Sequence, residues 1–373
     1  MVPVSETREA IAGAKRLVVK VGSSALTTAG DGLDTARLDA LVDALAARVA
    51  AGTQLVLVSS GAIGAGLAPL SLGKRPKELA TQQAAASVGQ LALAHAYVES
   101  FGRYSLTVGQ VLLTSDDVVR RAHYRNAERT FSTLLELGAV PVVNENDTVA
   151  TEEIRFGDND RLATLVAHLI GAEGLVLLSD VDALYDGDPR SGGTRRIHEV
   201  THGSELDGLS VGMSSSGLGT GGMMSKVAAA TTAAAAGIPV LIAAAAQAPT
   251  ALGDAGTGTA FKPAGTRLSA RRFWLGYAAG ARGRLQLDDG AVTAVVRRRR
   301  SLLPAGITGV DGDFQAGDVV DLVDPGQHVV ARGVVAYDVT ELPGMIGRST
   351  PDLPPEQRRE VVHADDLVPL GKR

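Results

Sequence analysis

The chain contains no cysteine among its 373 residues. That absence excludes disulfide bonds, cysteine nucleophiles and thiolate-bound metals, and it is typical of a reducing compartment. Aromatic residues make up only 3% of the chain, so the core has to be built from Ala, Val, Leu and Ile. The formal net charge of −5 is opposite in sign to that of a dedicated nucleic-acid binder. We therefore expect a soluble globular protein without thiol chemistry.

Long hydrophobic runs are also missing. Residues 1–16 contain no apolar h-region, so we expect no signal peptide and a cytoplasmic location. Residues 228–246 are uncharged, but they are rich in the weakly apolar alanine and are interrupted by Gly237-Ile238-Pro239. This segment predicts a helix, a turn and a buried strand rather than a membrane span.

Strand-like and helix-like segments alternate through about the first 260 residues. Continuous apolar strands separated by helices indicate a mostly parallel sheet that is covered on both faces, and ligands bind beyond the carboxyl ends of such strands. The apolar runs lie at 17–21, 54–58, 106–113, 140–143, 175–178 and 239–242, and the helical patterns between them include 76–99, 161–170 and 223–236.

The pattern changes after about Phe261. Residues 262–282 contain a stretch rich in Pro, Gly and Arg and predict a linker. Residues 283–373 consist of short alternating segments, which predict a separate all-β domain. Its predicted turns lie at the pairs Asp289-Gly290, Asp311-Gly312, Gly317-Asp318 and Pro325-Gly326.

Two glycine-containing segments follow the first and second predicted strands. Lys20 stands before Gly22-Ser23-Ser24, and a lysine beside small residues with free backbone N–H groups suits phosphate oxygens. Residues 59–66 read SSGAIGAG, whose three glycines let a ligand approach the backbone closely. A solvated strand end and a tight turn with glycines for packing explain the same two patterns without a ligand.

Two polar segments follow further along the chain. Residues 144–147 (NEND) and 156–161 (FGDNDR) suit a substrate ammonium group, a lysine to be positioned or Mg²⁺, although a polar loop with an Asp N-cap has the same composition. Residues 217–226 form a glycine-rich loop that ends in Lys226 at the start of a predicted helix. Such a loop favours nucleotide phosphates, and the alternative is a surface loop that merely precedes a helix.

Three common motifs do not account for the chain. Residues 217–222 contain G-x-G-x-x-G, but a serine run precedes them and no acidic residue occurs from 223 to 253, so we exclude NAD binding. No G-x-x-x-x-G-K-[ST] motif is present. Residues 198–202 spell H-E-x-x-H, but Val200, Thr201 and Gly203 are poor helix formers. We interpret this match as a chance occurrence in a surface connection and not as a zinc site.

The four polar segments, in this order, resemble the amino acid kinase family, and within it the glutamate 5-kinases. The resemblance runs almost from Lys15 to the C-terminus, and GDND and GLGTGGM are its most specific parts. The C-terminal domain is similar to the PUA domain, with SLLPAGI at 301–307 as its most recognisable stretch. The stretches that carry the kinase resemblance are VVKVGS at 18–23, SSGAI at 59–63, VNEND at 143–147, GDND at 157–160 and GLGTGGM at 217–223.

The resemblance implies an open αβα sandwich with a mostly parallel sheet for residues 1–261, followed by the linker and a small all-β PUA-like domain. It implies that Lys20 and Lys226 contact the phosphates and that Asp160 holds these lysines in place. Glutamate contacts are implied for Ser60, Asp147 and Asn159. ATP contacts are implied for Lys20, Ser179, Asp180, Thr220, Gly221, Gly222, Met223, Met224, Ser225 and Lys226, and Asp158 is a candidate ligand for Mg²⁺.

The implied reaction is ATP- and Mg²⁺-dependent phosphorylation of the L-glutamate γ-carboxylate to L-glutamyl 5-phosphate, the first step of proline biosynthesis. The resemblance also implies a homo-oligomer, a dimer or a tetramer, and a functional link to glutamyl-phosphate reductase. The chemistry agrees, because a glutamate side chain with a pKa of about 4.3 is already an anion at neutral pH and needs no general base. Such a nucleophile needs cations that neutralise the triphosphate.

Two alternatives stay open. Another amino acid kinase, acting on N-acetylglutamate or aspartate, uses the same fold, although those families lack the PUA-like module. Asp147 favours free glutamate, since an N-acetyl group removes the ammonium charge that this carboxylate would pair with. The second alternative is an RNA-binding PUA protein, because residues 297–300 are four arginines; we interpret them instead as a solvated strand end.

Overall fold

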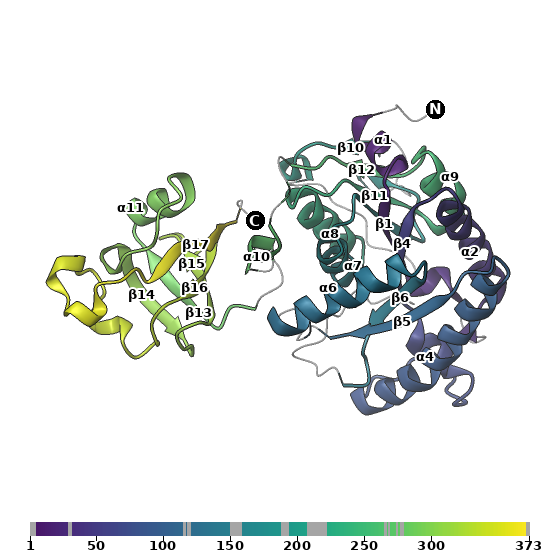
Figure 1. The fold of residues 1–373 in the computed structure, drawn as a ribbon, viewed down its shortest axis with the longest axis horizontal. Helices are drawn as coiled ribbons and strands as arrows, with labels where there is room; N and C mark the ends of the chain where they lie inside the picture. Colours follow the sequence, from purple (N-terminus) through teal and green to yellow (C-terminus); the bar gives the residue numbers. More distant parts are fainter. Residues whose placement is uncertain are drawn as a thin grey trace. The chain divides into compact units, whose positions relative to one another are not determined.

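The structure is a computed structural model that divides the chain into two compact units, Met1–Arg267 and Leu268–Arg373. Figure 1 draws the two units, and each has its own hydrophobic core. The predicted linker, 262–282, spans the division between them. The residues that the structure describes are 5–28, 32–114, 117, 121–149, 159–187, 194–206, 222–264, 267, 269–273, 275–276 and 280–370.

The first unit contains an eight-stranded sheet, which confirms the predicted mostly parallel architecture. Among its strands, β12 runs antiparallel to β11, and β10 runs parallel to β12, while the ladders from β11 to β5 are parallel. In order across the sheet the strands are β10 (Glu199–Val200), β12 (Thr259–Phe261), β11 (Val240–Ala244), β7 (Gly174–Ser179), β1 (Arg16–Val21), β4 (Gln54–Ser59), β6 (Val140–Glu145) and β5 (Val108–Leu113).

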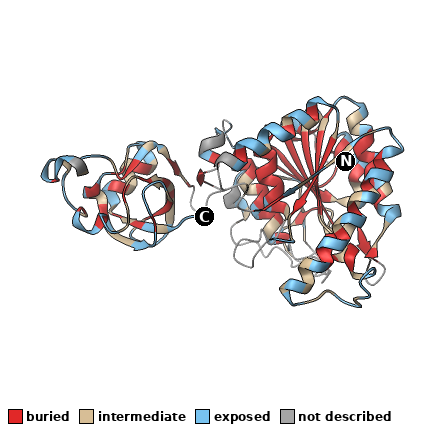
Figure 2. Ribbon diagram, turned by 60° about the horizontal axis from the view of Figure 1, so that its bottom comes forward, coloured by how far each residue is buried: buried red, intermediate tan, exposed pale blue. Residues whose placement is uncertain are grey.

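Helices cover both faces of this sheet, as Figure 2 shows by their buried inner sides and exposed outer sides. α1, α2, α4 and α9 pack with alternate strand residues such as Val19 and Val21 into one core cluster. α6, α7 and α8 pack against the other face, where Lys20 contacts α7. The helices are α1 (Glu6–Ala12), α2 (Thr35–Ala50), α3 (Ala62–Leu67), α4 (Leu79–Gly102), α6 (Arg121–Glu136), α7 (Asn159–Leu169), α8 (Met223–Ala235) and α9 (Ala248–Gly253).

Two short hairpins complete the described part of the first unit. β2 (Thr27–Thr28) pairs with β3 (Gly32–Leu33) just before α2, and β8 (Leu184–Tyr185) pairs with β9 (Arg196–Ile197) after β7. Both hairpins begin shortly after the carboxyl end of a strand of the main sheet, β1 or β7. They therefore stand at the edge of the sheet where ligands bind in folds of this kind.

Local sequence explains where α2 begins and ends. The Asp34 carboxylate accepts a hydrogen bond from the backbone N–H of Arg37 at 3.1 Å and so caps the first turn. Gly52 has φ +91°, a left-handed conformation that stops the helix at little cost for glycine. Leu38, Leu41 and Leu45 recur at helical spacing and are buried, which is the apolar face that the sequence predicts.

The alanine-rich segment 228–246 forms the end of α8, a turn and the buried strand β11, as predicted. Gly237 supplies the turn with φ +86°. No helix in the part of the chain that the structure describes combines the length and apolar character that crossing a membrane requires.

The glycines after β4 serve two different purposes. Gly61 has φ +109° and makes the turn from β4 into α3. Gly66 allows α3 to cross α4 closely, because a Cβ built on it would lie 1.9 Å from the carbonyl oxygen of Ala85. Gly89 on α4 has the same function from the other side, with 1.8 Å to the carbonyl oxygen of Ala62. The packing alternative therefore accounts for Gly66.

The second unit contains a five-stranded sheet in the order β14-β13-β15-β16-β17, which confirms the predicted β domain. Its core includes Phe314, Tyr337 and Leu342. The strands are β13 (Gly283–Leu287), β14 (Ile307–Gly312), β15 (Val319–Val323), β16 (Val329–Val335) and β17 (Val362–Pro369), and the short helices are α10 (Ala270–Phe273) and α11 (Asp289–Val292).

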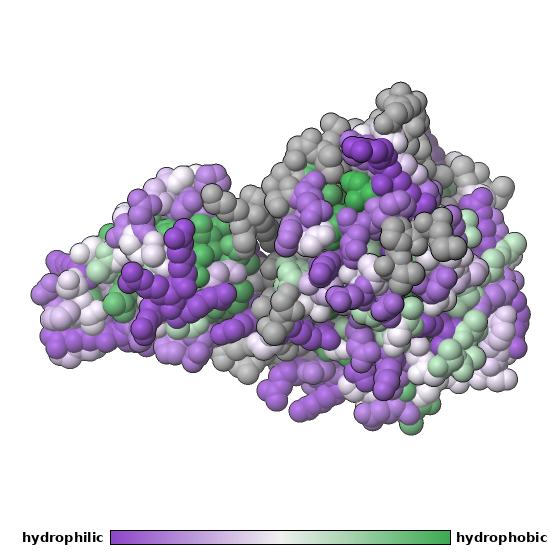
Figure 3. Space-filling view, turned by 90° about the horizontal axis from the view of Figure 1, so that it is seen from above, coloured by the Kyte–Doolittle hydropathy of each residue, from purple (hydrophilic) through white to green (hydrophobic). Residues whose placement is uncertain are grey.

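Two local predictions in this unit are wrong. Asp289-Gly290 is not a turn between strands but the beginning of α11, because the Asp288 carboxylate accepts from the N–H of Ala291 and caps a helix. The four arginines at 297–300 do not end a strand. Arg297 is the last residue of a π-helical turn, Thr293–Arg297, Arg298–Arg300 follow it, and all four arginines are exposed. On the face of the molecule drawn in Figure 3, hydrophilic side chains are widespread and hydrophobic side chains gather in smaller patches.

Candidate active site

The order of the strands places a crevice between β1 and β7. These two strands are parallel neighbours, but the chain leaves β1 through α2 on one face and reaches β11 from β7 through α8 on the other. Connections that diverge to opposite faces open a gap at the carboxyl ends of the two strands. This gap is where a ligand is expected.

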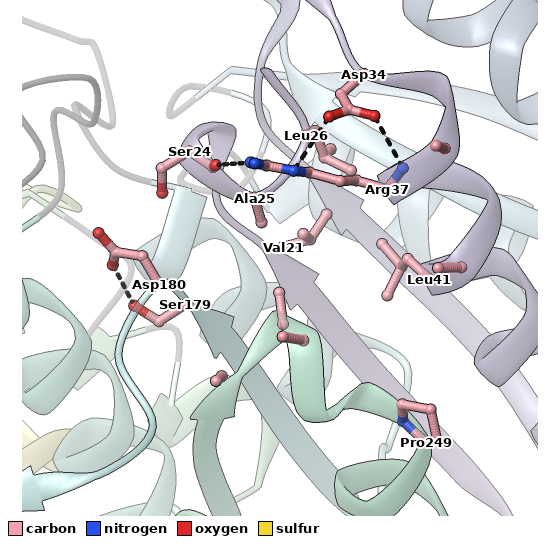
Figure 4. A pocket seen from close by; sticks show the side chains of 15 residues that line it. Val21, Ser24, Ala25, Leu26, Asp34, Arg37, Leu41, Ser179, Asp180 and Pro249 are labelled. Atoms are coloured by element: carbon pink, nitrogen blue, oxygen red, sulfur yellow. Dashed lines mark hydrogen bonds and ion pairs between the residues drawn. The ribbon is translucent and has the colours of Figure 1, made fainter. Parts of the chain in front are cut away.

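A cavity of about 620 Å³ lies at these strand ends (Figure 4). Val21 and Ser179, the last residues of β1 and β7, both line it, together with Asp180. Arg37 lies at another wall, where its guanidinium pairs with Asp34 at 3.1 Å and faces the carbonyl of Ser24 at 3.5 Å. The remaining lining is apolar and comes from the segment after β1, from α2, from the end of β11 with the residues after it, and from the start of α9: Ala25, Leu26, Ala36, Ala40, Leu41, Ala244, Ala245, Ala246 and Pro249.

Two lysines that are far apart in the sequence meet at one carboxylate. The Lys20 Nζ lies 2.6 Å from Asp160 Oδ1, and the Lys226 Nζ lies 3.3 Å from Asp160 Oδ2. Asp160 is fully buried, and the lysines are 3% and 6% exposed. A buried carboxylate that binds both ammonium groups fixes their positions, because a long flexible side chain would otherwise sample many rotamers.

Asp160 can bind both lysines because of the packing of α7 and α8. Asp160 is the second residue of α7, and Lys226 is the fourth residue of α8, so both lie in first turns. Thr164 joins the helices, since its hydroxyl lies 3.2 Å from the backbone carbonyls of both Asp160 and Ala229. Ser225 Oγ lies 3.4 Å from Asp160 Oδ2 and 2.9 Å from the Gly222 carbonyl at the N-cap of α8.

Next to Lys20, Lys226 and Asp160, the side-chain amide of Asn159 connects three segments. Its Nδ2 donates toward the Ser59 carbonyl at 3.0 Å, the Ser60 hydroxyl at 2.9 Å and Asn144 Oδ1 at 2.8 Å. The ends of β4 and β6 and the start of α7 are thereby tied together. The structure thus brings two of the predicted glutamate contacts, Ser60 and Asn159, within hydrogen-bond distance of each other.

Tyr97 supports this cluster from α4. Its hydroxyl is hydrogen-bonded to Ser59 Oγ at 2.9 Å, and Ser59 Oγ lies 3.2 Å from the Ser60 carbonyl. Burial raises the pKa of the Tyr97 phenol, and the hydrogen bond with Ser59 lowers it in part. The phenol therefore stays protonated and can donate to Ser59 throughout the neutral range.

The other predicted site residues have different surroundings. Asp147 lies two residues beyond the end of β6, the strand that contributes Asn144. Ser179 Oγ donates to Asp180 Oδ1 at 3.0 Å at the cavity wall. Met223 is buried, whereas Met224 is 64% exposed and points away from the core. Asp158, Thr220 and Gly221 lie outside the described residues.

Sequence reasoning missed several residues of this region. Gln90 reaches the amide cluster from α4, where its Oε1 accepts from Asn144 Nδ2 at 2.7 Å. Arg37 and Asp34 line the cavity from the start of α2. The sequence feature that could have indicated Gln90 is an amide side chain between Gly89 and Leu91 within an alanine-rich helix. Polar residues in that setting are also common on solvated helix faces, so the feature does not single out Gln90.

The H-E-x-x-H match does not form a metal centre. Glu199 and Val200 form the short strand β10 rather than a helix, so the histidines do not share a helical face. Within the described part of the chain, no group of three or more His, Cys, Asp or Glu side chains could hold a metal ion.

Comparison with known proteins shows which families the two units of the chain match. Residues 15–244 match the model of the amino acid kinase family, and residues 283–353 match that of the PUA domain. Proteins named glutamate 5-kinase are similar along almost the whole chain. The Nocardia farcinica protein is 65% identical over 365 residues, which are 98% of this chain and 100% of that protein. The Rhodococcus opacus protein is 63% identical over 367 residues, with the same coverage.

A solved structure shares the fold of the first unit. Carbamate kinase from Giardia lamblia, bound to AMP-PNP, superimposes with a TM-score of 0.51 at 17% identity and covers 68% of this chain and 100% of its own. With a family model over most of the first unit and relatives above 60% identity over nearly the full length, the chain belongs to the amino acid kinase family and, within it, to the glutamate 5-kinases.

Proposed function

We propose that this chain transfers the γ-phosphoryl group of ATP to the γ-carboxylate of L-glutamate, giving L-glutamyl 5-phosphate and ADP, the first step of proline biosynthesis. The observation that carries the proposal is the meeting of Lys20 and Lys226 at the buried Asp160, next to the Ser60–Asn159 cluster. The glutamate 5-kinases that share more than 60% identity with the chain support the choice of substrate.

The reaction needs positive charge more than it needs a base. A carboxylate oxygen of glutamate attacks the γ-phosphorus, the bond from that phosphorus to the β,γ-bridging oxygen breaks, and the electron pair leaves with ADP. No proton has to move, because the nucleophile is ionised at neutral pH. The barrier comes from bringing one anion to another, so catalysis rests on positioning and on electrostatic stabilisation.

Lys20 and Lys226 suit this task because they approach from different elements. Lys20 extends from β1, and Lys226 rises from the first turn of α8. We assign both ammonium groups to the phosphoryl oxygens and Asp160 to holding the ammonium groups where charge accumulates in the transition state. Preorganisation of this kind avoids reorientation of the charges during the reaction.

We place ATP in the crevice at Ser179 and Asp180, with its phosphates toward the N-terminus of α8, where Gly222 and Ser225 stand. The partial positive charge of a helix N-terminus favours phosphate there. Mg²⁺, which enters on the nucleotide and keeps several of its waters, would neutralise phosphate charge. Asp158 stays the candidate protein ligand for that ion.

Substrate choice depends on the polar groups after β6. Asp147 offers a carboxylate to the ammonium group of free glutamate. N-acetylglutamate has no such charge and would leave the carboxylate without its partner. We therefore propose that glutamate is preferred over both N-acetylglutamate and aspartate, whose shorter side chain does not bring its carboxylate to the same place.

A hydroxamate trap tests this function. The protein is incubated with Mg-ATP, hydroxylamine and one acceptor at a time, and the hydroxamate that forms from an acyl phosphate is measured. We expect product with glutamate and little with N-acetylglutamate or aspartate. Product with N-acetylglutamate alone would overturn the substrate assignment, and no product with any of the three would contradict a carboxylate kinase.

We also propose that the chain acts as a homo-oligomer in the cytoplasm and passes its product to glutamyl-phosphate reductase, since acyl phosphates hydrolyse readily. α4 carries an exposed apolar stripe at Val88, Leu91 and Val98, next to the edge strand β5 with the exposed Leu112. A second copy related by a two-fold axis would bury this stripe against itself. Sedimentation of wild type and of Leu91→Lys should show a loss of mass in the variant, and equal masses would remove α4 from the interface.

A further inference from the structure

Three buried or half-buried amides form a relay that leads into the active site. Gln90 on α4 accepts from Asn144 Nδ2 at 2.7 Å, and Asn144 Oδ1 accepts from Asn159 Nδ2 at 2.8 Å. Asn144 is only 2% exposed. The three residues lie 54 and 15 positions apart, on α4, β6 and α7, so the relay exists only in the folded chain.

Two backbone groups fix the direction of this relay. Asn144 Oδ1 also accepts from the backbone N–H of Glu145 at 2.9 Å, and an N–H can only donate. Asn159 Nδ2 faces the backbone carbonyl of Ser59, which can only accept. Both asparagine amides therefore have one allowed orientation, with Asn144 Nδ2 directed to Gln90.

In this fixed orientation, the side-chain oxygen of Asn159 is available to accept a hydrogen bond from a ligand. Its Oδ1 is buried and has no donor among the residues that the structure describes. A buried oxygen of this kind is satisfied by a ligand N–H and is repelled by a ligand carboxylate. Of the polar groups of an amino acid substrate, only the ammonium group donates.

We propose that Gln90 is a positioning residue for substrate selection, which acts through Asn144 to hold Asn159 Oδ1 toward the substrate ammonium group. This inference rests on the proposed function, because it takes an amino acid as the acceptor. Without the Gln90 oxygen, the buried Asn144 Nδ2 loses its acceptor, and this cost in free energy favours rotation of the Asn144 amide. Rotation would present Nδ2 to Asn159 and to the Glu145 N–H, and the orientation of Asn159 would no longer be fixed.

The test compares glutamate with glutarate, which has both carboxylates but no ammonium group. The ratio of kcat/KM for the two acceptors is measured by hydroxamate formation in wild type, Gln90→Met and Gln90→Glu. We expect Gln90→Met to lower the glutamate preference by about tenfold, mainly through KM for glutamate, with KM for ATP within about twofold. Gln90→Glu keeps an oxygen acceptor for Asn144 and should retain most of the preference.

Control variants separate positioning from packing. Gln54→Met makes the same exchange at the first residue of β4, whereas the candidate site lies at the carboxyl end of this strand. It should leave the preference for glutamate over glutarate unchanged. Gln90→Ala carries the test if Gln90→Met does not fold. An equal loss for glutamate and glutarate, an unchanged preference, or a Gln90→Glu ratio as low as that of Gln90→Met would each overturn the inference. Wild-type activity with glutamate is measured first, so failure of the kinase function itself is recognised separately.

Discussion

Replacing Lys20 by methionine removes one of the two ammonium groups that Asp160 holds, while it keeps a side chain of similar length. At an effective dielectric constant of about 20, two unit charges about 4 Å apart interact by about 4 kcal/mol. Since each 1.36 kcal/mol is tenfold in rate, losing such a contact to the transferring phosphoryl group would cost about 10³. Part of the contact already exists with bound ATP, so we expect kcat to fall by about 10²-fold or more.

The assay is hydroxamate formation at saturating glutamate and ATP, with folding verified by thermal melting. Lys15→Met is the matched control, because Lys15 precedes β1 at the opposite edge of the sheet and its side chain is exposed. We expect this control to retain wild-type kcat. A kcat for Lys20→Met within about twofold of wild type would remove Lys20 from the mechanism and refute the electrostatic reasoning.

Three other changes have defined outcomes. Gly89→Ala places a Cβ 1.8 Å from a backbone carbonyl of α3, so it should lower the free energy of unfolding by about 1–3 kcal/mol or more. The control Gly102→Ala, whose Cβ has no atom within 4 Å, should leave the free energy of unfolding unchanged. Equal melting temperatures for the two variants would contradict the close crossing of α3 and α4. Asp160→Asn leaves two buried ammonium groups without their shared carboxylate, so denaturant titration should show a loss of about 3–5 kcal/mol together with a fall in kcat. Replacing Arg297–Arg300 by serine should change kcat by less than about twofold, because the site residues Lys20, Asp160 and Lys226 pair with one another and not with these arginines; RNA binding that weakens with salt and disappears in this variant would instead support the RNA alternative.

The sheet could be predicted because its strands are continuous apolar runs. Val18 and Val19 are buried on opposite faces of β1, so both positions must be apolar, and such a run is easy to recognise. The segments near Asp289 and Arg297 were harder. Asp-Gly pairs and arginine runs occur in turns, in helix caps and at strand ends alike, and the N-cap contact from Asp288 that decides for a helix depends on the folded backbone.

For the candidate site, the sequence indicated single residues but not which residues would contact one another in the fold. That Lys20 lies near the carboxyl end of a strand was visible in the sequence, and ligands bind beyond the carboxyl ends of such strands. The meeting of Lys20 with Lys226, 206 positions away, depends on how α7 packs against α8, which periodicity does not specify; only the family resemblance suggested it. Gln90 was missed because its partner, Asn144, is supplied by a different element, β6.

The central claim is that the side-chain carboxylate of glutamate attacks the γ-phosphorus of ATP. Glutamate carrying ¹⁸O in both γ-carboxylate oxygens is incubated with the protein, Mg-ATP and hydroxylamine, and the released phosphate is examined by mass spectrometry. Attack by the carboxylate leaves its bridging oxygen on phosphorus when hydroxylamine cleaves the acyl bond, so we predict one ¹⁸O in each phosphate released with hydroxamate. Unlabelled phosphate from this substrate would contradict the account, and so would labelled phosphate from a second substrate that carries ¹⁸O only in the α-carboxylate.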